Sequence, residues 1–264
     1  MGIKVLKFIN MRYLIKLAYD GSGFHGWQIQ PNAISVQETI ENCLSKIFSQ
    51  SVNLVGCGRT DTGVHATNFY AHFDAIKVNY DNANLVFKLN KMLPNLICIK
   101  ECYPVSSDFH ARFSATSRKY HYYISKYKNP FKVNQVWFYN NSKHFDLSLM
   151  KEAGELLMKH EDFTSFAKLH TDAKTNICDV MAFNIEETSD EIVLNIKSNR
   201  FLRNMVRAIV GTLVEVGSRK LTVKEFEKII VIKDRQAASF SAPASGLFLS
   251  EIEYPSELLK DITI

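Results

Sequence analysis

The stretch SVQETIENCLSKIFS, residues 35–49, carries the strongest helix signal in the chain. Ser35 followed by Glu38 matches the S-x-x-E pattern of a helix N-terminus, in which the serine side chain caps a backbone N–H of the first turn. Apolar side chains then recur at the spacing of one helical face, at Val36, Ile40, Cys43, Leu44 and Ile47. The sequence therefore predicts a helix at residues 35–49 with one buried face.

Strand patterns flank this helix on both sides. β-branched and aromatic residues bounded by turn residues predict strands, and a Pro marks the end of a helix. These signals predict strands at 13–19, 52–55, 70–73 and 97–103 and a helix at 82–93, before Pro94. Together with helix 35–49 these elements form one α+β unit.

The second half of the chain repeats a similar order of elements, without a residue-level repeat. It contains predicted strands at 118–125, 177–185 and 192–197 and predicted helices at 147–159, 201–216 and 222–232, the last capped by Thr222. We therefore expect two domains: residues 1–105, an N-terminal α+β half, and residues 106–264, a C-terminal α+β half.

Composition narrows the class of protein. Of the 264 residues 46% are hydrophobic and 22% charged, and no apolar run reaches the ~18 residues of a membrane span, so no membrane association is expected. The five cysteines suggest neither a disulfide framework nor a zinc ribbon, which favours a reducing cytoplasm. A net charge of +5 and a pI near 8.8 favour a polyanionic partner.

The positive charge gathers in one segment, residues 112–132. There, basic residues alternate with aromatic ones, which supplies phosphate-pairing charge beside faces on which bases can stack. The basic residues are Arg112, Arg118, Lys119, Lys126, Lys128 and Lys132, and the aromatic ones are Phe113, Tyr120, His121, Tyr122, Tyr123 and Tyr127. The segment predicts a nucleic-acid-binding surface.

The stretch GRTDTGVHA, residues 58–66, places Asp61 on the loop that leaves the predicted strand 52–55. Asp-Thr-Gly also occurs in aspartic proteases, and Asp and Gly are common in ordinary turns. A protease needs two carboxylates that share a proton, whereas this chain has one copy of the motif, with Arg59 two residues upstream. The aspartic-protease interpretation is therefore disfavoured.

Metal and phosphate sites are also disfavoured by spacing. His65, His72, Asp74 and His110 lie near the motif, but no pair has H-x-x-x-H or H-x-H spacing. The chain has no phosphate-loop or dinucleotide fingerprint, and no cofactor is expected.

Asp61 could act as a nucleophile or base if another group keeps it ionised and oriented. Arg207, at the edge of the apolar stripe of helix 201–216, is a candidate partner, since a charge on so apolar a helix usually has one. An arginine that extends to the surface is an equally good interpretation of Arg207.

Six ordered blocks of sequence resemble the TruA family of tRNA pseudouridine synthases over residues 13–253. They are GRTDTGVHA (58–66), YDGSGFHGWQIQP (19–31), SVQ (35–37), FHARFS (109–114), FLRNMVRAIVGT (201–212) and APASGLF (242–248). The sequence departs from the usual pattern at Thr175, where an arginine is common, and at residues 238–241, ASFS, in place of Gly-x-Thr.

The resemblance implies a role for several side chains. Asp61 would be the catalytic aspartate, Tyr120 the aromatic that stacks on the uracil, and Arg207 the ion-pair partner of Asp61. Arg59 would enter the RNA as the target base leaves the stack. A plain strand residue at Tyr120 and a phosphate contact at Arg59 remain open alternatives. The RNA-binding residues are expected to be Arg59, Arg112, Arg118, Lys119 and Arg203.

The fold implied is α+β (α/β mixed), with two ferredoxin-like or RRM-like halves. These would form a mostly antiparallel central sheet flanked by helices, with the active-site cleft between the halves. The substrate would be the anticodon stem-loop of tRNA, and the enzyme a cytoplasmic homodimer that uses neither metal nor cofactor. The alternative is a non-catalytic tRNA-binding or RNA-binding protein of the same fold, which would have no need for a carboxylate facing a polyanion.

Overall fold

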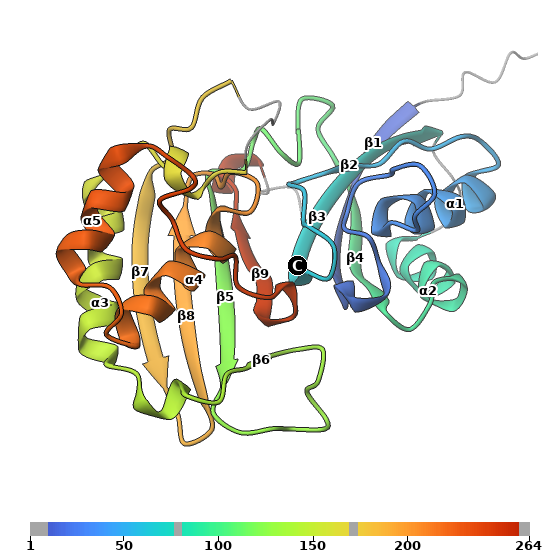
Figure 1. Ribbon diagram of the computed structural model, residues 1–264. Coiled ribbons are helices and arrows are strands. Elements are labelled where there is room, and N and C mark those ends of the chain that lie inside the picture. Colours follow the sequence, from blue (N-terminus) through green and yellow to red (C-terminus); the bar gives the residue numbers. More distant parts are fainter. Residues whose placement is uncertain (1–9, 77–80, 169–173, 259–264) are drawn as a thin grey trace, which may run out of the picture. The chain divides into compact units, whose positions relative to one another are not determined.

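The computed structural model describes residues 10–76, 81–168 and 174–258. These residues form two compact units (Figure 1). The first contains the described residues up to Thr60, those from Ala66 to Thr116 and those from Ile252, and the second contains Asp61–His65 and Ser117–Glu251. The predicted division at residues 105 and 106 remains a prediction.

The first unit has the β-α-β-β-α-β order of a ferredoxin-like half. Its strands lie in the order β4-β1-β3, with β2 beside β3, and all these pairs are antiparallel. The helices α1 and α2 lie side by side in Figure 1, and α2 packs against β4. The elements are β1 (Asn10–Tyr19), α1 (Val36–Phe48), β2 (Val55–Gly56), β3 (His65–Ile76), α2 (Asn82–Met92) and β4 (Ile97–Val105).

The second unit has the same order of elements with β6 and α5 added. Its strands lie in the order β9-β5-β8-β7, the pairs β5–β8 and β7–β8 are antiparallel, and the short β6 runs parallel to β5. The elements are β5 (Ser117–Ser125), β6 (Trp137–Phe138), α3 (Leu147–Glu155), β7 (Val180–Glu187), β8 (Glu191–Ser198), α4 (Met205–Gly217), α5 (Val223–Ile232) and β9 (Leu247–Glu253). The predicted α+β class, with mostly antiparallel strands flanked by helices, is confirmed.

Helix α4 is the centre of the second hydrophobic core. All its residues are buried except Arg207 and Glu215, and it packs against α3 and α5 (Figure 1). A helix that is apolar on nearly every side must be enclosed by other elements. A charged side chain on such a helix reaches solvent only where the surrounding elements leave the helix uncovered. The position of Arg207 therefore indicates where a functional site could lie.

Three predicted helices are confirmed, with their caps. The Ser35 side chain caps α1 through Glu38 N, and the Asp81 side chain caps α2 through Asn84 N. Thr222 and Glu225 form a reciprocal capping box at the start of α5. The predicted helix 147–159 is α3 followed by a turn of 3-10 helix at Leu156–Lys159.

Two predicted elements are corrected. The predicted helix 201–216 begins only at Met205, because Asn204 has φ of 66° in the left-handed region and breaks the helical path. The predicted strand 52–55 is reduced to Val55–Gly56, because the N–H groups of Val52 and Leu54 donate to side chains of α1.

Two strands were not predicted, the two-residue β6 and the longer β9. The stretch LFLSEIE forms β9, and its buried and exposed residues alternate along most of its length. The sequence itself does not alternate, because Leu247, Phe248 and Leu249 are all apolar, and this short apolar run after a glycine was the signal that could have indicated a strand. Among the described residues, no helix is long and apolar enough to cross a membrane.

Candidate active site

Asp61 lies on the turn between β2 and β3. The N–H of Val64 donates to the carbonyl of Asp61 at 3.1 Å, which closes the turn. Gly63 has φ of 77°, a conformation that side chains other than glycine rarely adopt. Val64 is buried in the core of the second unit, so the turn presents the Asp61 carboxylate from a fixed base.

Two arginines, Arg207 in the first turn of α4 and Arg203 just before the helix, contact this carboxylate. Arg207 Nη1 lies 3.6 Å from Asp61 Oδ2, and Arg203 Nε lies 3.7 Å from Asp61 Oδ1. The side chains of Asp61 and Arg207 are 26% and 21% exposed, and that of Arg203 is 58% exposed. Exposed ion pairs stabilise a fold by at most about 1 kcal/mol, so this arrangement serves orientation more than stability.

The guanidinium of Arg207 is positioned by backbone. Its Nε donates to the carbonyl of Ala242 at 2.7 Å, while the N–H of Ala242 donates to the carbonyl of Arg207 at 2.9 Å. A planar guanidinium can make both contacts, to Ala242 through Nε and to Asp61 through Nη1. The segment before Pro243 therefore determines where Arg207 points.

This segment, residues 238–243, is itself held by side chains. Arg235 donates to the carbonyls of Ala238 and Ser239 at 3.3 and 3.2 Å and to Ser241 Oγ at 3.1 Å. Asn204 Nδ2 donates to Ser241 Oγ at 2.6 Å. The buried Tyr122 hydroxyl donates to the carbonyl of Pro243 at 2.8 Å, and its burial raises the pKa of this phenol. The residues ASFS, which depart from the family pattern, are thus a well-anchored part of the second unit.

Tyr120, the predicted stacking residue, lies on β5 in the second unit. It is partly buried and lies edge-on to Phe201, with ring centroids 5.1 Å apart. Its neighbour Arg118 donates to the carbonyl of Asn199 at 2.8 Å, and Lys119 pairs with Lys197 across β5 and β8. The structure thus places Tyr120, Arg118 and Lys119 on one strand of the unit that contains Asp61.

Two predicted RNA contacts belong to the first unit. Arg59 is exposed and precedes Thr60, whose hydroxyl is hydrogen-bonded at 2.9 Å to that of Tyr19. Arg112 is exposed, with its guanidinium 5.6 Å from the ring centroid of Phe113. The structure therefore brings Asp61, Arg203 and Arg207 together, while Arg59 and Arg112 are fixed within the other unit.

Sequence reasoning missed part of the site. Arg203 was expected to bind RNA only, yet it lies beside Asp61. Its spacing of four from Arg207 would have indicated a shared face on a helix, but the left-handed Asn204 lies between them, so no helical argument applies. The carbonyl of Ala242 had no sequence signal, because a backbone acceptor can be any residue.

The basic segment is less uniform than its sequence. Lys126 Nζ lies 2.6 Å from Glu187, and Lys132 Nζ lies 2.6 Å from Glu191. Both lysines lie at the turn between β7 and β8, and the carboxylates of Glu187 and Glu191 offset their positive charges. Lys126 and Lys132 are therefore weaker phosphate contacts than the sequence suggested.

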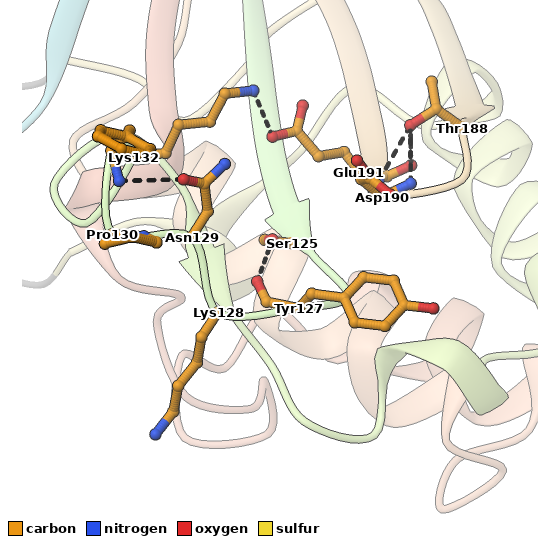
Figure 2. A pocket seen from close by; sticks show the side chains of 10 residues that line it. Ser125, Tyr127, Lys128, Asn129, Pro130, Lys132, Thr188, Asp190 and Glu191 are labelled. Atoms are coloured by element: carbon orange, nitrogen blue, oxygen red, sulfur yellow. Dashed lines mark hydrogen bonds and ion pairs between the residues drawn. The ribbon is translucent and has the colours of Figure 1, made fainter.

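A surface cavity of about 570 Å³ lies beside this turn (Figure 2). It is lined by Ser125, Tyr127, Lys128, Asn129, Pro130, Phe131, Lys132, Thr188, Asp190 and Glu191. Tyr127, Lys128 and Lys132 of the predicted basic aromatic segment are among them, but none of the residues predicted for catalysis is, and two carboxylates also line the cavity. The ion pairs at Asp61 are better evidence for the place of chemistry than the size of this cavity. In the part of the chain that the structure describes, no cluster of His, Cys, Asp and Glu could hold a metal ion.

Comparisons with known proteins define the class. The family model for tRNA pseudouridine synthases matches residues 155–255. The tRNA pseudouridine synthase A of Bacteroides fragilis is 48% identical over 250 residues, covering 94% of this chain and 98% of that protein. Its counterpart in Bacteroides thetaiotaomicron is 48% identical over 255 residues, covering 96% and 94%, and that of Parabacteroides distasonis is 47% identical over 247 residues, covering 94% and 97%.

The chain belongs to the tRNA pseudouridine synthase A family. The predicted family, and with it the predicted class of enzyme, a tRNA pseudouridine synthase, is confirmed. A solved structure of an unknown protein from Galdieria sulphuraria also matches 80% of this chain and 94% of that chain, at a TM-score of 0.20 and 10% identity, which is too low to support an argument.

Proposed function

We propose that this chain isomerises uridine to pseudouridine in tRNA and that Asp61 is its catalytic carboxylate. The observation that supports this most is the placement of Asp61 on a fixed turn between Arg203 and Arg207, at 3.7 and 3.6 Å. A non-catalytic RNA-binding protein would have no need to orient a carboxylate so carefully, since a negative charge weakens the binding of a polyanion.

The reaction breaks the bond between N1 and C1′, turns the uracil, and joins C5 to C1′. The base loses a proton from C5 and gains one at N1, so the product is an isomer of the substrate. An ionised Asp61 could attack C1′ or the base, or remove a proton from the sugar. Each carboxylate oxygen has one arginine beside it, Arg203 at Oδ1 and Arg207 at Oδ2, so the group is oriented in the same way whichever path applies.

We further propose the following roles for the remaining site residues. The target base must leave the helical stack, which costs a few kcal/mol that stacking and replacement contacts can offset. Tyr120 would stack on the extruded uracil, and Arg59 would enter the space that the base leaves. The remaining cations, Arg112, Arg118, Lys119 and Arg203, would contact RNA phosphates, because folded RNA exposes its backbone more readily than its paired base edges.

The anticodon stem-loop is the proposed part of the substrate, and a cytoplasmic homodimer the proposed form of the enzyme. Support for the cytoplasm comes from the substrate class and from the five cysteines, all of which are free thiols. The resemblance in sequence supports the stem-loop and the homodimer.

The direct test uses tRNA transcripts that carry tritium at C5 of uridine, without added metal or nucleotide. The wild-type protein is expected to release tritium from C5, and sequencing of the product should place pseudouridine in the anticodon stem-loop. Tight tRNA binding without tritium release, across a full set of tRNAs, would instead support the non-catalytic RNA-binding protein.

Arg207→Ala is expected to lower kcat by about 10²- to 10³-fold, the range for loss of one preorganised electrostatic group. The Kd for tRNA should change less than about threefold, because Arg207 is one cation among many and contacts Asp61 and Ala242. Single-turnover rates and filter binding measure the two quantities separately.

The matched control for this variant is Lys220→Ala. It removes an exposed cation that follows α4 and lies 3.3 Å from Glu215, the other charged residue of that helix. Its kcat should stay near the wild-type value. Arg207→Lys keeps the charge but cannot make both contacts of the guanidinium, so its kcat should fall between the other two. Equal losses of kcat and affinity in Arg207→Ala would refute the pairing role.

A further inference from the structure

Phe113 is an exposed aromatic ring on a rigid segment, which is an unusual combination. Its side chain is 76% exposed, although water-exposed phenylalanine contributes nothing to the core. The ring lies against His110, with centroids 4.3 Å apart and planes at 33°. On its other neighbour, Arg112, the guanidinium carbon lies 5.6 Å from the ring centroid. The fold itself does not need Phe113 at this position.

The backbone around Phe113 is fixed by hydrogen bonds. His110 Nδ1 accepts from the N–H groups of Arg112 and Phe113, both at 3.2 Å, and the N–H of His110 donates to Ser114 Oγ at 3.0 Å. The N–H of Ala111 donates to His72 Nδ1 at 3.1 Å. The carbonyl of Ala111 accepts from the Tyr254 hydroxyl at 2.7 Å. The ring of Phe113 is therefore presented before any ligand arrives.

The two histidines can accept these bonds only as neutral rings. Burial and the charge of Arg12 lower the pKa of His72 to about 4, and burial lowers that of His110. Arg12 makes a bidentate contact with Asp74, with Nε and Nη2 each 2.8 Å from one carboxylate oxygen. This contact with Asp74 raises the pKa of Arg12, and the charge of Asp108 adds to the effect. The hydrogen bonds that hold the segment are therefore intact at neutral pH.

We propose that Phe113, supported from behind by His110, is a stacking platform for an unpaired base of the tRNA. This inference rests on the proposed function, and it names a contact beyond the cations and the uracil-binding residue. Every base has a face that can stack on an aromatic ring, and a cation beside the ring can pair with the phosphate of the same nucleotide. Arg112 supplies that cation. A preformed ring avoids the entropy that an adaptable contact would lose on binding.

The test compares Phe113→Ala with Phe87→Ala as a matched control. Phe87 lies in the same unit, is 61% exposed and has Lys91 Nζ 5.6 Å from its ring centroid, but it lies on α2, outside the basic aromatic segment. We expect Phe113→Ala to weaken tRNA binding roughly tenfold, within the range for loss of one stacked base. Phe87→Ala should leave the Kd unchanged. Thermal unfolding of both variants should match the wild type.

The dependence of binding on salt separates stacking from charge. Phe113→Ala should leave the slope of log K against log salt unchanged, whereas Arg112→Ala should reduce it by about 1. Phe113→Trp should bind like the wild type, and Phe113→Leu like the alanine variant, because leucine keeps apolar area but has no π face. The loss in Phe113→Ala should also vanish for a blunt duplex of the anticodon stem, which has no unpaired base.

Several outcomes would overturn the proposal. If Phe113→Ala had the wild-type Kd, Phe113 would make no contact that contributes to tRNA binding. If Phe113→Leu had the wild-type Kd, the contact would be apolar packing instead of stacking. A change of oligomeric state with unchanged tRNA binding would assign the ring to an interface between copies of the chain. These results are distinct from failure of the proposed function, which would appear as absent tritium release by the wild-type protein.

Discussion

Asp61→Asn is expected to lower the rate of pseudouridine formation by at least about 10³-fold. Loss of a reacting or orienting carboxylate has effects of this size or larger in enzymes whose groups act as a unit. Asparagine keeps the size of the side chain, but it removes the charge and replaces one of the two acceptor oxygens by an NH2 donor. The closed turn from Asp61 to Val64 is made by backbone atoms and should survive the change. Single-turnover tritium release under saturating enzyme measures the effect on chemistry.

Affinity for tRNA should behave differently from rate in this variant. Removing a negative charge beside Arg203 and Arg207 releases both cations to face the RNA, so the Kd should be unchanged or a few-fold lower. Asp190→Asn is the matched control, because it removes an exposed carboxylate from the same unit at the turn between β7 and β8. The control should react at the wild-type rate. If Asp61→Asn retained a tenth of the activity, the catalytic assignment would be wrong.

The fold was predictable from sequence where local signals agree with packing. The helices α1, α2 and α5 carry both a capping residue and a clear apolar face, and their boundaries lie within about one residue of the prediction. The start of α4 was mispredicted because Phe201 and Leu202 continue the apolar pattern of the helix toward the N-terminus. The left-handed Asn204 follows them in the chain, so the helix cannot begin before Met205. The spacing of apolar residues indicates which side chains are buried, but it cannot predict the backbone angle of one residue such as Asn204.

The candidate site was predictable only in part, for a similar reason. Asp61 and Arg207 are a charge in a turn motif and a charge on an apolar helix, and the structure places them 3.6 Å apart. Their roles remain predictions. The anchors of the site could not be predicted. Arg207 is held by the carbonyl of Ala242, and the position of this carbonyl depends on the segment 238–243. That segment is held in turn by Arg235, Asn204 and Tyr122. Side-chain identity carries no information about such acceptors.

These anchors make Gly211→Ala the substitution with the largest expected effect outside the reacting groups. A Cβ at Gly211 would overlap the carbonyl oxygen of Phe240 and lie 3.0 Å from its carbonyl carbon. The obstacle is backbone and cannot rotate away as a side chain would. Overpacking of this kind costs about 1–3 kcal/mol, partly offset by up to ~1 kcal/mol from the better helix propensity of alanine. The Tm should fall by about 2–4 °C for each kcal/mol of net loss.

The same substitution should lower kcat in the protein that remains folded. Ser239 N donates to Thr212 Oγ1 at 3.2 Å and Ala242 N donates to the Arg207 carbonyl at 2.9 Å, so the segment is attached to α4 on both sides of Phe240. Moving Phe240 outward therefore displaces the Ala242 carbonyl that orients Arg207. We expect a fall in kcat of about tenfold or more below the Tm, since an ångström of misplacement can cost up to about 100-fold.

Gly217→Ala separates the effect on stability from the effect on kcat. Gly217 is the last residue of α4, and a Cβ there meets the flexible side chain of Met150 in α3. This substitution should lower the Tm without changing kcat. Thermal unfolding and single-turnover rates at 25 °C, measured on both variants, provide the comparison. A Gly211→Ala protein that is destabilised yet reacts at the wild-type rate would show that Arg207 keeps its position without the Ala242 carbonyl, and the backbone would then have no part in orienting the ion pair.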